Sequence, residues 1–233
     1  MRQLPLSVRI PDRAVFNTYL PARNAQAVEH LSLVSGGHRF ETTWLCGPHG
    51  TGKTHLLQAV CVQVSETQQA AYFPMREFVS LGVGVLEELS PFDCLCLDDV
   101  DAVTGNREWE RALFAVLIEM QERGARLVMS AEVPPALVKW TLPDLGSRCA
   151  ASAVFQLRLL DEHEQQEALK LRARVRGVEL PDETARWLLR RFPRDMRTLY
   201  ELLDTLDEAS LVAQRRLTVP FIRSVLKDND AAP

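Results

Sequence analysis

Short apolar runs alternate along the chain with longer segments in which apolar residues recur every three or four positions. Each run is nearly continuous in apolar character, as expected for strands that are buried on both faces of a parallel sheet. The runs are TTWLC (42–46), AAYFP (70–74), DCLCL (93–97), RLVMS (126–130) and AVFQL (153–157).

The segments between these runs have the apolar spacing of helices. They are GKTHLLQAVCVQV (52–64), MREFVSLGVGVLEEL (75–89) and REWERALFAVLIEMQERG (107–124). Asn106 can cap the last of them, and Gly124 can end it. Strands that alternate with helices predict a doubly wound α/β domain with a five-stranded parallel sheet.

After residue 157 the pattern changes to helical segments without a strand between them. Gly177 and Pro181 mark a helix end and the next helix start. We therefore predict an extended N-terminal peptide (1–11), an α/β domain (12–157) and a small all-α domain (158–233). The four helical segments are DEHEQQEALKLRARVRG (161–177), PDETARWLLRRF (181–192), RDMRTLYELLDTLDEASLVAQ (194–214) and TVPFIRSVLKD (218–228).

Composition narrows the class of protein. Of the 233 residues, 46% are hydrophobic and 25% charged, which is typical of a globular protein rather than a disordered one. No apolar run is long enough to span a membrane, and no signal peptide is recognisable, so we expect a cytoplasmic protein with no membrane partner. The net charge of −4 argues against a protein that holds nucleic acid unaided. The chain contains five cysteines, an odd number, and we predict that they are buried thiols that form no zinc site.

The segment that follows the first strand matches the phosphate-binding pattern G-x-x-x-x-G-K-[ST]. Its glycines allow successive backbone N–H groups to face an anion, and the following helix adds its N-terminal dipole. Lys53 can reach the β- and γ-phosphates, and the Thr54 hydroxyl can bind Mg²⁺. We expect the segment to bind ATP or ADP, with His49 and His55 making local contacts rather than acting as bases. Its residues are Gly47, Pro48, His49, Gly50, Thr51, Gly52, Lys53, Thr54 and His55.

Two acidic residues, Asp98 and Asp99, directly follow the apolar run at 93–97. At the end of a strand beside the phosphate loop, the first carboxylate can hold Mg²⁺, directly or through water. The second carboxylate can orient the attacking water in nucleotide hydrolysis. We therefore predict a metal-binding role for Asp98 with Thr54 and a catalytic role for Asp99.

With these two motifs the chain resembles the AAA+ ATPases, and among them the bacterial DnaA initiators, whose acidic pair is also Asp-Asp. The resemblance spans about residues 12–228. LPDLGSRCA (142–150) implies an arginine finger at Arg148, and RDMRTLYELLD (194–204) implies a second sensor at Arg197 in a helical lid. FNTYLPARN (16–24) corresponds to the adenine-contacting segment and implies roles for Leu20 and Asn24. The first sensor falls in MSAE (129–132), on either Ser130 or Glu132.

Within this clade the chain is similar to the Hda family of regulatory inactivators of DnaA. The parts that carry this likeness are QLPLS (3–7), LRARVRGVELPDE (171–183) and MRTL (196–199). The resemblance implies that Gln3, Leu4 and Leu6 bind the DNA-loaded sliding clamp, which would connect the protein to DNA and the nucleoid. It also implies that a nucleotide-bound core promotes hydrolysis of ATP on a DnaA-type initiator, so that replication initiation is inhibited, while its own ATPase is weak or absent.

Alternatives remain open at this stage. Arg148 can be an ordinary surface residue, and Arg197 can pair with Glu201 one helical turn away. The chain can also be a small AAA+ helicase loader or DNA-handling ATPase, which predicts DNA-stimulated hydrolysis, or a nucleotide-dependent interaction scaffold. Whether it forms a homo-oligomer is open as well.

Overall fold

The computed structural model describes residues 14–37, 41–89, 91–192 and 195–230. The chain divides into two compact units, one up to Arg158 and one from Leu159 onward. Residues 1–11, for which we predict a clamp-binding peptide with Gln3, Leu4 and Leu6, lie outside the described residues.

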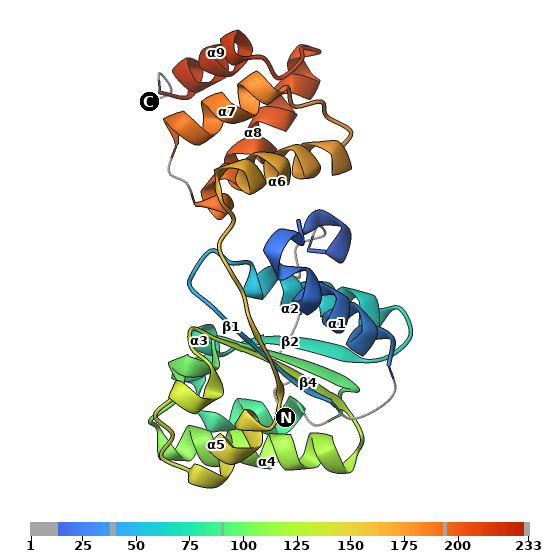
Figure 1. Cartoon of the computed structure of the whole chain (residues 1–233), viewed down its shortest axis with the longest axis vertical. Helices are drawn as coiled ribbons and strands as arrows, with labels where there is room; N and C mark the ends of the chain where they lie inside the picture. Colours follow the sequence, from blue (N-terminus) through green and yellow to red (C-terminus); the bar gives the residue numbers. More distant parts are fainter. Residues whose placement is uncertain (1–13, 38–40, 90, 193–194, 231–233) are drawn as a thin grey trace. The chain divides into compact units, whose positions relative to one another are not determined.

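The first unit contains a five-stranded parallel sheet with the strand order β2-β3-β4-β1-β5 (Figure 1). The predicted fold class is thereby confirmed. Each strand forms where an apolar run predicts it. The inner strands β3, β4 and β1 are buried on both faces, whereas the edge strand β5 has Val154 and Gln156 exposed on one face. The strands are β1 (Thr42–Cys46), β2 (Ala70–Pro74), β3 (Cys94–Asp98), β4 (Arg126–Ala131) and β5 (Ala153–Gln156).

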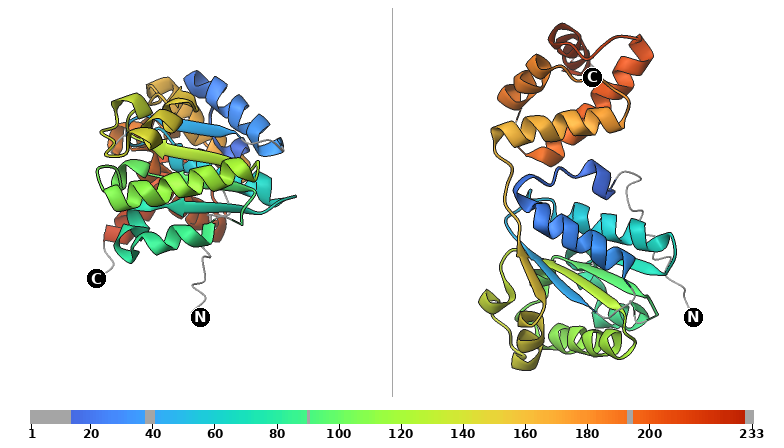
Figure 2. Two further views of the ribbon diagram at one scale, coloured as in Figure 1. Left: turned by 90° about the horizontal axis from the view of Figure 1, so that it is seen from below. Right: turned by 45° about the vertical axis from the view of Figure 1, so that its right-hand side comes forward.

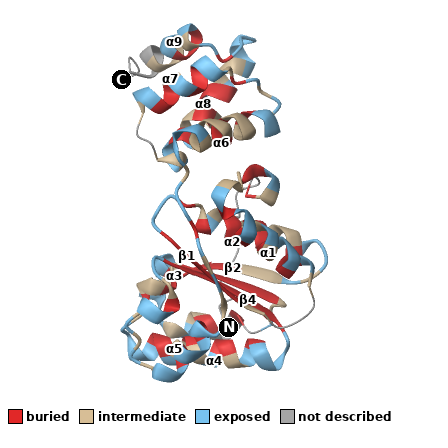
Figure 3. Cartoon of the chain, in the orientation of Figure 1, coloured by how far each residue is buried: buried red, intermediate tan, exposed pale blue. Residues whose placement is uncertain are grey.

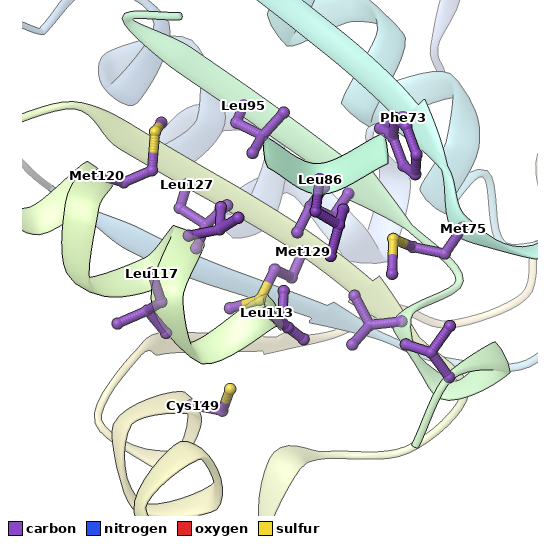
Figure 4. Close-up of a cluster of buried hydrophobic side chains, with 14 of the residues drawn as sticks. Phe73, Met75, Leu86, Leu95, Leu113, Leu117, Met120, Leu127, Met129 and Cys149 are labelled. Atoms are coloured by element: carbon purple, nitrogen blue, oxygen red, sulfur yellow. The ribbon is translucent and has the colours of Figure 1, made fainter. Parts of the chain in front are cut away.

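Helices cover both faces of this sheet (Figure 2). On one face, α1 (Ala25–Gly36) and α2 (Lys53–Ser65) enclose a core that includes Leu45, Leu57 and Val128. On the other face, α4 (Arg107–Glu122) and α5 (Pro143–Ala150) enclose the core shown in Figure 4, where Leu113 and Leu117 of α4 lie close to Met129 of β4. Asn106 caps α4 as predicted, since its Oδ1 accepts the N–H groups of Glu108 and Trp109.

One helix prediction is wrong. The segment 75–89 does not form a single helix but a short α3 (Met75–Phe78) followed by two 3₁₀ segments, η3 (Val79–Leu81) and η4 (Val83–Leu89). Gly82 separates them with a φ of +84°, a left-handed conformation that interrupts a right-handed helix. The sequence also gave no clear signal for α1. The remaining short 3₁₀ segments are η1 (Phe16–Thr18), η2 (Ala22–Asn24), η5 (Val100–Ala102) and η6 (Pro135–Leu137).

The described part of the second unit consists of helices and their connecting loops and has a core of its own, visible as the buried inner faces of its helices in Figure 3. Gly177, with a φ of +76°, follows α6, and Pro181 precedes α7. Charged side chains also join α6 to α8: the Arg176 guanidinium lies 2.7 Å from Asp204 and 3.1 Å from Asp207. The helices are α6 (Glu162–Val175), α7 (Asp182–Arg191), α8 (Met196–Ala213) and α9 (Val219–Asp230).

All five cysteines are buried and none forms a disulfide. Cys94 and Cys96 face the same side of β3, toward Cys61 of α2, as the strand alternation predicts. Burial, followed by the neighbouring thiols Cys61 and Cys94, raises the pKa of Cys96. Within the part of the chain that is described, no helix is both long and apolar enough to cross a membrane.

Candidate nucleotide-binding site

The phosphate loop connects β1 to α2, and its glycines have conformations that other residues rarely adopt. Gly47, Gly50 and Gly52 have φ values of +152°, +84° and +87°. A Cβ atom on Gly52 would lie 2.6 Å from the Tyr19 ring, and one on Gly47 would lie 2.7 Å from the Leu157 carbonyl oxygen. The loop therefore needs glycine both for its backbone angles and for the space around it.

Two side chains of the loop close it on itself. Lys53 is buried, and its Nζ donates to the Gly47 carbonyl at 2.7 Å and to the Pro48 carbonyl at 3.4 Å. The Thr51 hydroxyl also donates to Pro48, at 2.9 Å. Lys53 thus lies directly behind the loop, at the first position of α2, where backbone N–H groups have no partner within the helix. Pro48, His49 and Gly50 form the exposed rim of the loop.

Asp98 lies at the centre of a hydroxyl cluster at the end of β3. Its Oδ2 accepts the hydroxyl groups of Thr54 at 2.7 Å and Tyr72 at 2.8 Å, and its Oδ1 accepts the hydroxyl of Ser130. Burial, followed by the nearby negative charge of Asp98, raises the pKa of Tyr72, so this hydroxyl stays protonated and acts as a donor. Thr54 and Asp98, which the sequence assigns to Mg²⁺, are therefore in direct contact.

The strand order explains why Ser130 joins this cluster. β4 lies between β1, which leads into the phosphate loop, and β3, which carries Asp98. Ser130 near the end of β4 is fully buried, and its Oγ also accepts the Asp99 N–H at 3.0 Å. The Glu132 side chain is exposed, while its carbonyl accepts the Gly47 N–H at 3.2 Å. Of the two first-sensor candidates, Ser130 is the one whose side chain contacts the acidic pair.

Asp99 has a different environment from Asp98. Its backbone adopts a left-handed conformation, with φ 55° and ψ 51°, which is uncommon for residues other than glycine but is adopted by aspartate more readily than by most. Its carboxylate accepts the Arg76 Nε–H at 3.2 Å, and this hydrogen bond raises the pKa of Arg76. The two acidic residues thus point to different partners, and a catalytic role of Asp99 stays a prediction.

The segment before α1 packs against the phosphate loop through Tyr19 and Asn24. The Tyr19 hydroxyl donates to the Thr51 carbonyl at 3.0 Å and accepts the Asn24 amide at 3.0 Å. Asn24 also exchanges two hydrogen bonds with the backbone of Arg158, at 2.8 and 3.0 Å. In the structure the Asn24 amide therefore connects the loop to the last residue of the first unit. The nucleotide contact that the resemblance implies for it stays a prediction.

Leu20 and His55 lie in the same region. Leu20 is half-buried and follows Tyr19 directly. The His55 Nε2 lies 3.0 Å from the Val15 carbonyl and 3.2 Å from the Thr18 hydroxyl, and its ring centroid is 5.6 Å from that of Tyr19. These contacts agree with a local packing role for His55, since they tie α2 to the segment before α1.

The residues present fit a nucleoside phosphate with Mg²⁺. The glycine loop, the N-terminus of α2 and Lys53 supply N–H donors and a positive charge for phosphate oxygens. Thr54 and Asp98 supply neighbouring oxygen atoms, which are the ligands that Mg²⁺ prefers. Among the described residues there is no cluster of three or more His, Cys, Asp or Glu side chains that could hold a metal ion by itself.

Arg148 lies on the exposed face of α5, in its last turn, rather than in a loop after it. Its Nη1 donates to Gln121 Oε1 at 2.8 Å, and its guanidinium carbon lies 5.5 Å from the centre of the Phe114 ring. Both partners belong to α4. Among the described residues, Arg148 contacts α4 rather than the phosphate loop, so the structure does not bring it together with this chain's own phosphate site.

Arg197 lies in the first turn of α8, in the second unit. Its Nε donates to Glu201 at 3.1 Å, and the two side chains are 80% and 67% exposed. This is the pair one helical turn apart that the sequence offers as the alternative to a sensor. A role of Arg197 in nucleotide sensing stays a prediction.

Sequence reasoning missed Tyr19, Tyr72 and Arg76. Tyr72 lies in the middle of an apolar strand, and Arg76 lies in a segment without a recognisable motif. Tyr19 lies in the segment 16–24, for which the resemblance implied roles only for Leu20 and Asn24. The only available signal was the polar hydroxyl of Tyr72 within an otherwise apolar run, which requires a hydrogen-bond partner when buried.

Two family models match the chain. Residues 12–154 match the model described as the bacterial DnaA ATPase domain. Residues 161–226 match the model described as the lid domain of Hda. The match to an ATPase domain implies that the chain binds nucleotide, in agreement with the loop, Lys53 and the Asp98 cluster.

Solved structures share the fold at low sequence identity. Domain III of the replication initiation protein DnaA from Thermotoga maritima has a TM-score of 0.76 and 21% identity, over 94% of this chain and 97% of that one. AMPPCP-bound DnaA from Aquifex aeolicus has a TM-score of 0.69 and 19% identity, over 84% and 66%. The RuvB Holliday junction branch migration motor from Thermotoga maritima has a TM-score of 0.63 and 17% identity, over 87% and 68%. These likenesses establish the fold alone.

Proposed function

Because the chain belongs to the bacterial DnaA ATPase family and carries an Hda-type lid, we propose that it is a negative regulator of replication initiation. In this proposal the nucleotide-bound protein binds a DnaA-type initiator and promotes hydrolysis of the ATP that the initiator carries. It does so while attached to the DNA-loaded sliding clamp, which gives it indirect access to DNA.

The nucleotide in this chain's own site has a structural role in the proposal. The loop amides and Lys53 bind the phosphates, and Thr54 and Asp98 hold the Mg²⁺ that neutralises phosphate charge. Bound nucleotide would further order the loop, whose Thr51 carbonyl accepts a hydrogen bond from the Tyr19 hydroxyl. Arg197 of the lid and Leu20 and Asn24 of the N-terminal segment are the further residues that we assign to nucleotide recognition.

The observation that carries the proposal is the position of Arg148. It is exposed on the outer face of α5, while the cation that contacts this chain's own phosphate loop is Lys53. A guanidinium on the outside of an ATPase domain can reach the γ-phosphate of a neighbouring subunit, where it stabilises the charge that develops during hydrolysis. Such a finger changes rates by about 10³- to 10⁵-fold.

The clamp contact is assigned to the N-terminal peptide. An extended segment with Gln3, Leu4 and Leu6 can place an amide and two leucine side chains in pockets of a partner. Pro5 favours the extended form that such a motif needs.

A phosphate-release assay tests the proposal. ATP-loaded initiator is mixed with this protein, nucleotide and clamp loaded on DNA, and the hydrolysis rate is compared with and without each component. We expect acceleration that requires both this protein and the loaded clamp. Arg148→Ala should abolish the acceleration while leaving nucleotide binding intact. Replacement of Gln3, Leu4 and Leu6 by alanine should abolish clamp binding, and with it the clamp-dependent acceleration, while leaving nucleotide binding intact.

The outcomes separate the alternatives. Acceleration that is independent of the clamp would contradict the clamp part of the proposal. Hydrolysis by this chain alone that rises on adding DNA would indicate a DNA-handling ATPase instead. Full acceleration by the Arg148→Ala variant would refute the finger assignment.

A further inference from the structure

One face of α4 contacts both ends of the segment that carries Arg148. Glu110, Phe114 and Gln121 are spaced by four and seven residues, which places them on the same face of the helix. We refer to these three residues as the α4 stripe. Glu110 contacts the chain just before α5, whereas Phe114 and Gln121 contact Arg148 near the end of α5.

Glu110 is fully buried, and its carboxylate accepts hydrogen bonds from several groups. Oε2 accepts the N–H and hydroxyl of Thr141 at 2.9 and 2.7 Å and the N–H of Leu142 at 2.7 Å. Oε1 accepts the Gly105 N–H at 2.8 Å. Leu142 is the N-cap residue of α5, so this carboxylate fixes the chain at the point where α5 begins. A negative charge is also favourable at a helix N-terminus.

Burial raises the pKa of Glu110, but the hydrogen bonds from Thr141, Gly105 and Leu142 outweigh burial and lower it below the ordinary glutamate value. The group is therefore a carboxylate at neutral pH. As an acceptor-only group it matches the N–H and O–H donors around it, whereas an amide would present an N–H group to one of them.

The body of α5 is held down by packing. Leu145 and Cys149 are fully buried, and Figure 4 shows Cys149 near Leu117 of α4. A Cβ atom on Gly146 would lie 2.6 Å from the Trp140 ring, so the helix approaches that ring as closely as glycine allows. These contacts fix the position of α5 beside α4, with Arg148 on the exposed face of α5.

We propose that Glu110 and Gln121 are positioning residues for Arg148, Glu110 by fixing the start of α5 and Gln121 by holding the guanidinium itself. The inference rests on the proposed role of Arg148 toward a partner's nucleotide. An unrestrained arginine side chain has many rotamers, and each one that points away from the partner's phosphate lowers the fraction of productive complexes. Gln121 uses one of the five N–H donors of the guanidinium, and the other donors remain for the phosphate.

The test measures hydrolysis of initiator-bound ATP with the full chain and clamp on DNA, at increasing concentrations of the protein. Gln121 is exposed, so Gln121→Ala is expected to fold normally. We expect its maximal rate to fall by about 3- to 10-fold, the effect of one lost hydrogen bond, at an unchanged half-saturating concentration. Glu119→Ala on the exposed part of the same helix is the matched control and should leave the rate unchanged.

Combining the substitutions asks whether Gln121 acts through Arg148. Any acceleration that remains in the Arg148→Ala background should not change further with Gln121→Ala, because the group that it holds is already gone. An unchanged or faster rate in the single variant would overturn the proposal, as would an equal fractional loss of the acceleration that Arg148→Ala retains. Glu110→Gln should also lower the maximal rate, provided that thermal unfolding shows a folded protein.

A second readout is independent of the proposed function. The order parameter of the Arg148 Nε–H can be measured by NMR in the full chain, with its signal assigned by its disappearance in Arg148→Ala. We expect it to fall in Gln121→Ala and not in Glu119→Ala. Should the wild-type protein fail to accelerate hydrolysis, this result still decides the positioning role. An unchanged order parameter would refute that role even if the finger assignment holds.

Discussion

Replacing Tyr19 by phenylalanine removes a single oxygen atom between the phosphate loop and the segment before α1. The hydroxyl donates to the Thr51 carbonyl and accepts the Asn24 amide, both at 3.0 Å. The ring remains, so its close contact with Gly52 is preserved. Burial raises the pKa of Tyr19 to about 12, despite the opposing hydrogen bond from Asn24, so the hydroxyl is protonated at any pH used for the measurement.

The expected loss of stability follows from the two groups left behind. Thr51 and Asn24 are only 5% and 4% exposed, so water cannot easily replace the missing oxygen. Asn24 keeps its two bonds to Arg158, so one amide N–H and one carbonyl lose a partner. A neutral hydrogen bond contributes about 1 kcal/mol, and a buried unsatisfied group costs about 1–3 kcal/mol. We therefore expect the free energy of unfolding of the first unit to fall by about 2 kcal/mol.

Urea unfolding followed by tryptophan fluorescence measures this loss, because Trp44, Trp109 and Trp140 lie in the first unit and only Trp187 in the second. With a urea m-value of about 2 kcal/mol/M, the midpoint should decrease by about 1 M. The double variant with Asn24→Ala should lose less than the sum of the two single losses, since both remove the same bond. An unchanged midpoint with an unchanged m-value would refute the view that this hydroxyl braces the loop.

Four further outcomes are expected. Lys53→Ala should weaken nucleotide binding at least tenfold by calorimetry, because it removes the only side-chain cation of the loop without altering the sheet. Gln121→Glu places a carboxylate beside Arg148, so it should raise the free energy of unfolding by at most about 1 kcal/mol. It should also slow the hydrolysis of ATP on the partner, and a faster rate would contradict the finger assignment. A thiol reagent should label the native protein far more slowly than the urea-unfolded chain, which should show all five thiols. Folding lowers the pKa of Glu110, so its contribution to stability is present above about pH 4.3 and is lost as the pH falls through the folded pKa. The difference in the free energy of unfolding between wild type and Glu110→Gln should therefore become smaller in acid.

The inner strands of the sheet could be predicted from the sequence because a strand buried on both faces is apolar at nearly every position. β1 and β2 begin and end where the apolar runs do, and the other strands differ by a residue or less at their ends. The segment 75–89 was misread because its apolar spacing suits a helix, and periodicity gives no weight to the left-handed Gly82 that divides it. The local pattern thus predicts a strand or helix well where burial is uniform along it. It predicts poorly where the backbone conformation of one residue determines where the element ends.

For the candidate site, the sequence predicted the residues that lie in motifs directly after a strand. It did not predict the residues on neighbouring strands that the strand order brings next to them. Thr54 and Asp98 were predicted as partners from their motifs, and their oxygens lie 2.7 Å apart. Tyr72 and Ser130 reach the same carboxylate only because β2 and β4 flank β3, an order that short-range pattern does not contain. The stripe on α4 is of the same kind, since Glu110 and Thr141 are far apart in the chain and meet only through the packing of α4 beside the start of α5.

The two exposed arginines that the resemblance singles out differ in what neutralises them. Arg197 donates one N–H to the exposed carboxylate of Glu201, so a phosphate that binds its remaining donors also meets a neighbouring negative charge. Arg148 donates to a neutral amide and lies against an aromatic ring, and among the described residues it forms no ion pair. A cation held in place by neutral groups keeps its full charge for an incoming anion. The neutral surroundings of Arg148 therefore favour a phosphate supplied by another subunit, whereas a phosphate that approaches Arg197 is also repelled by the carboxylate of Glu201.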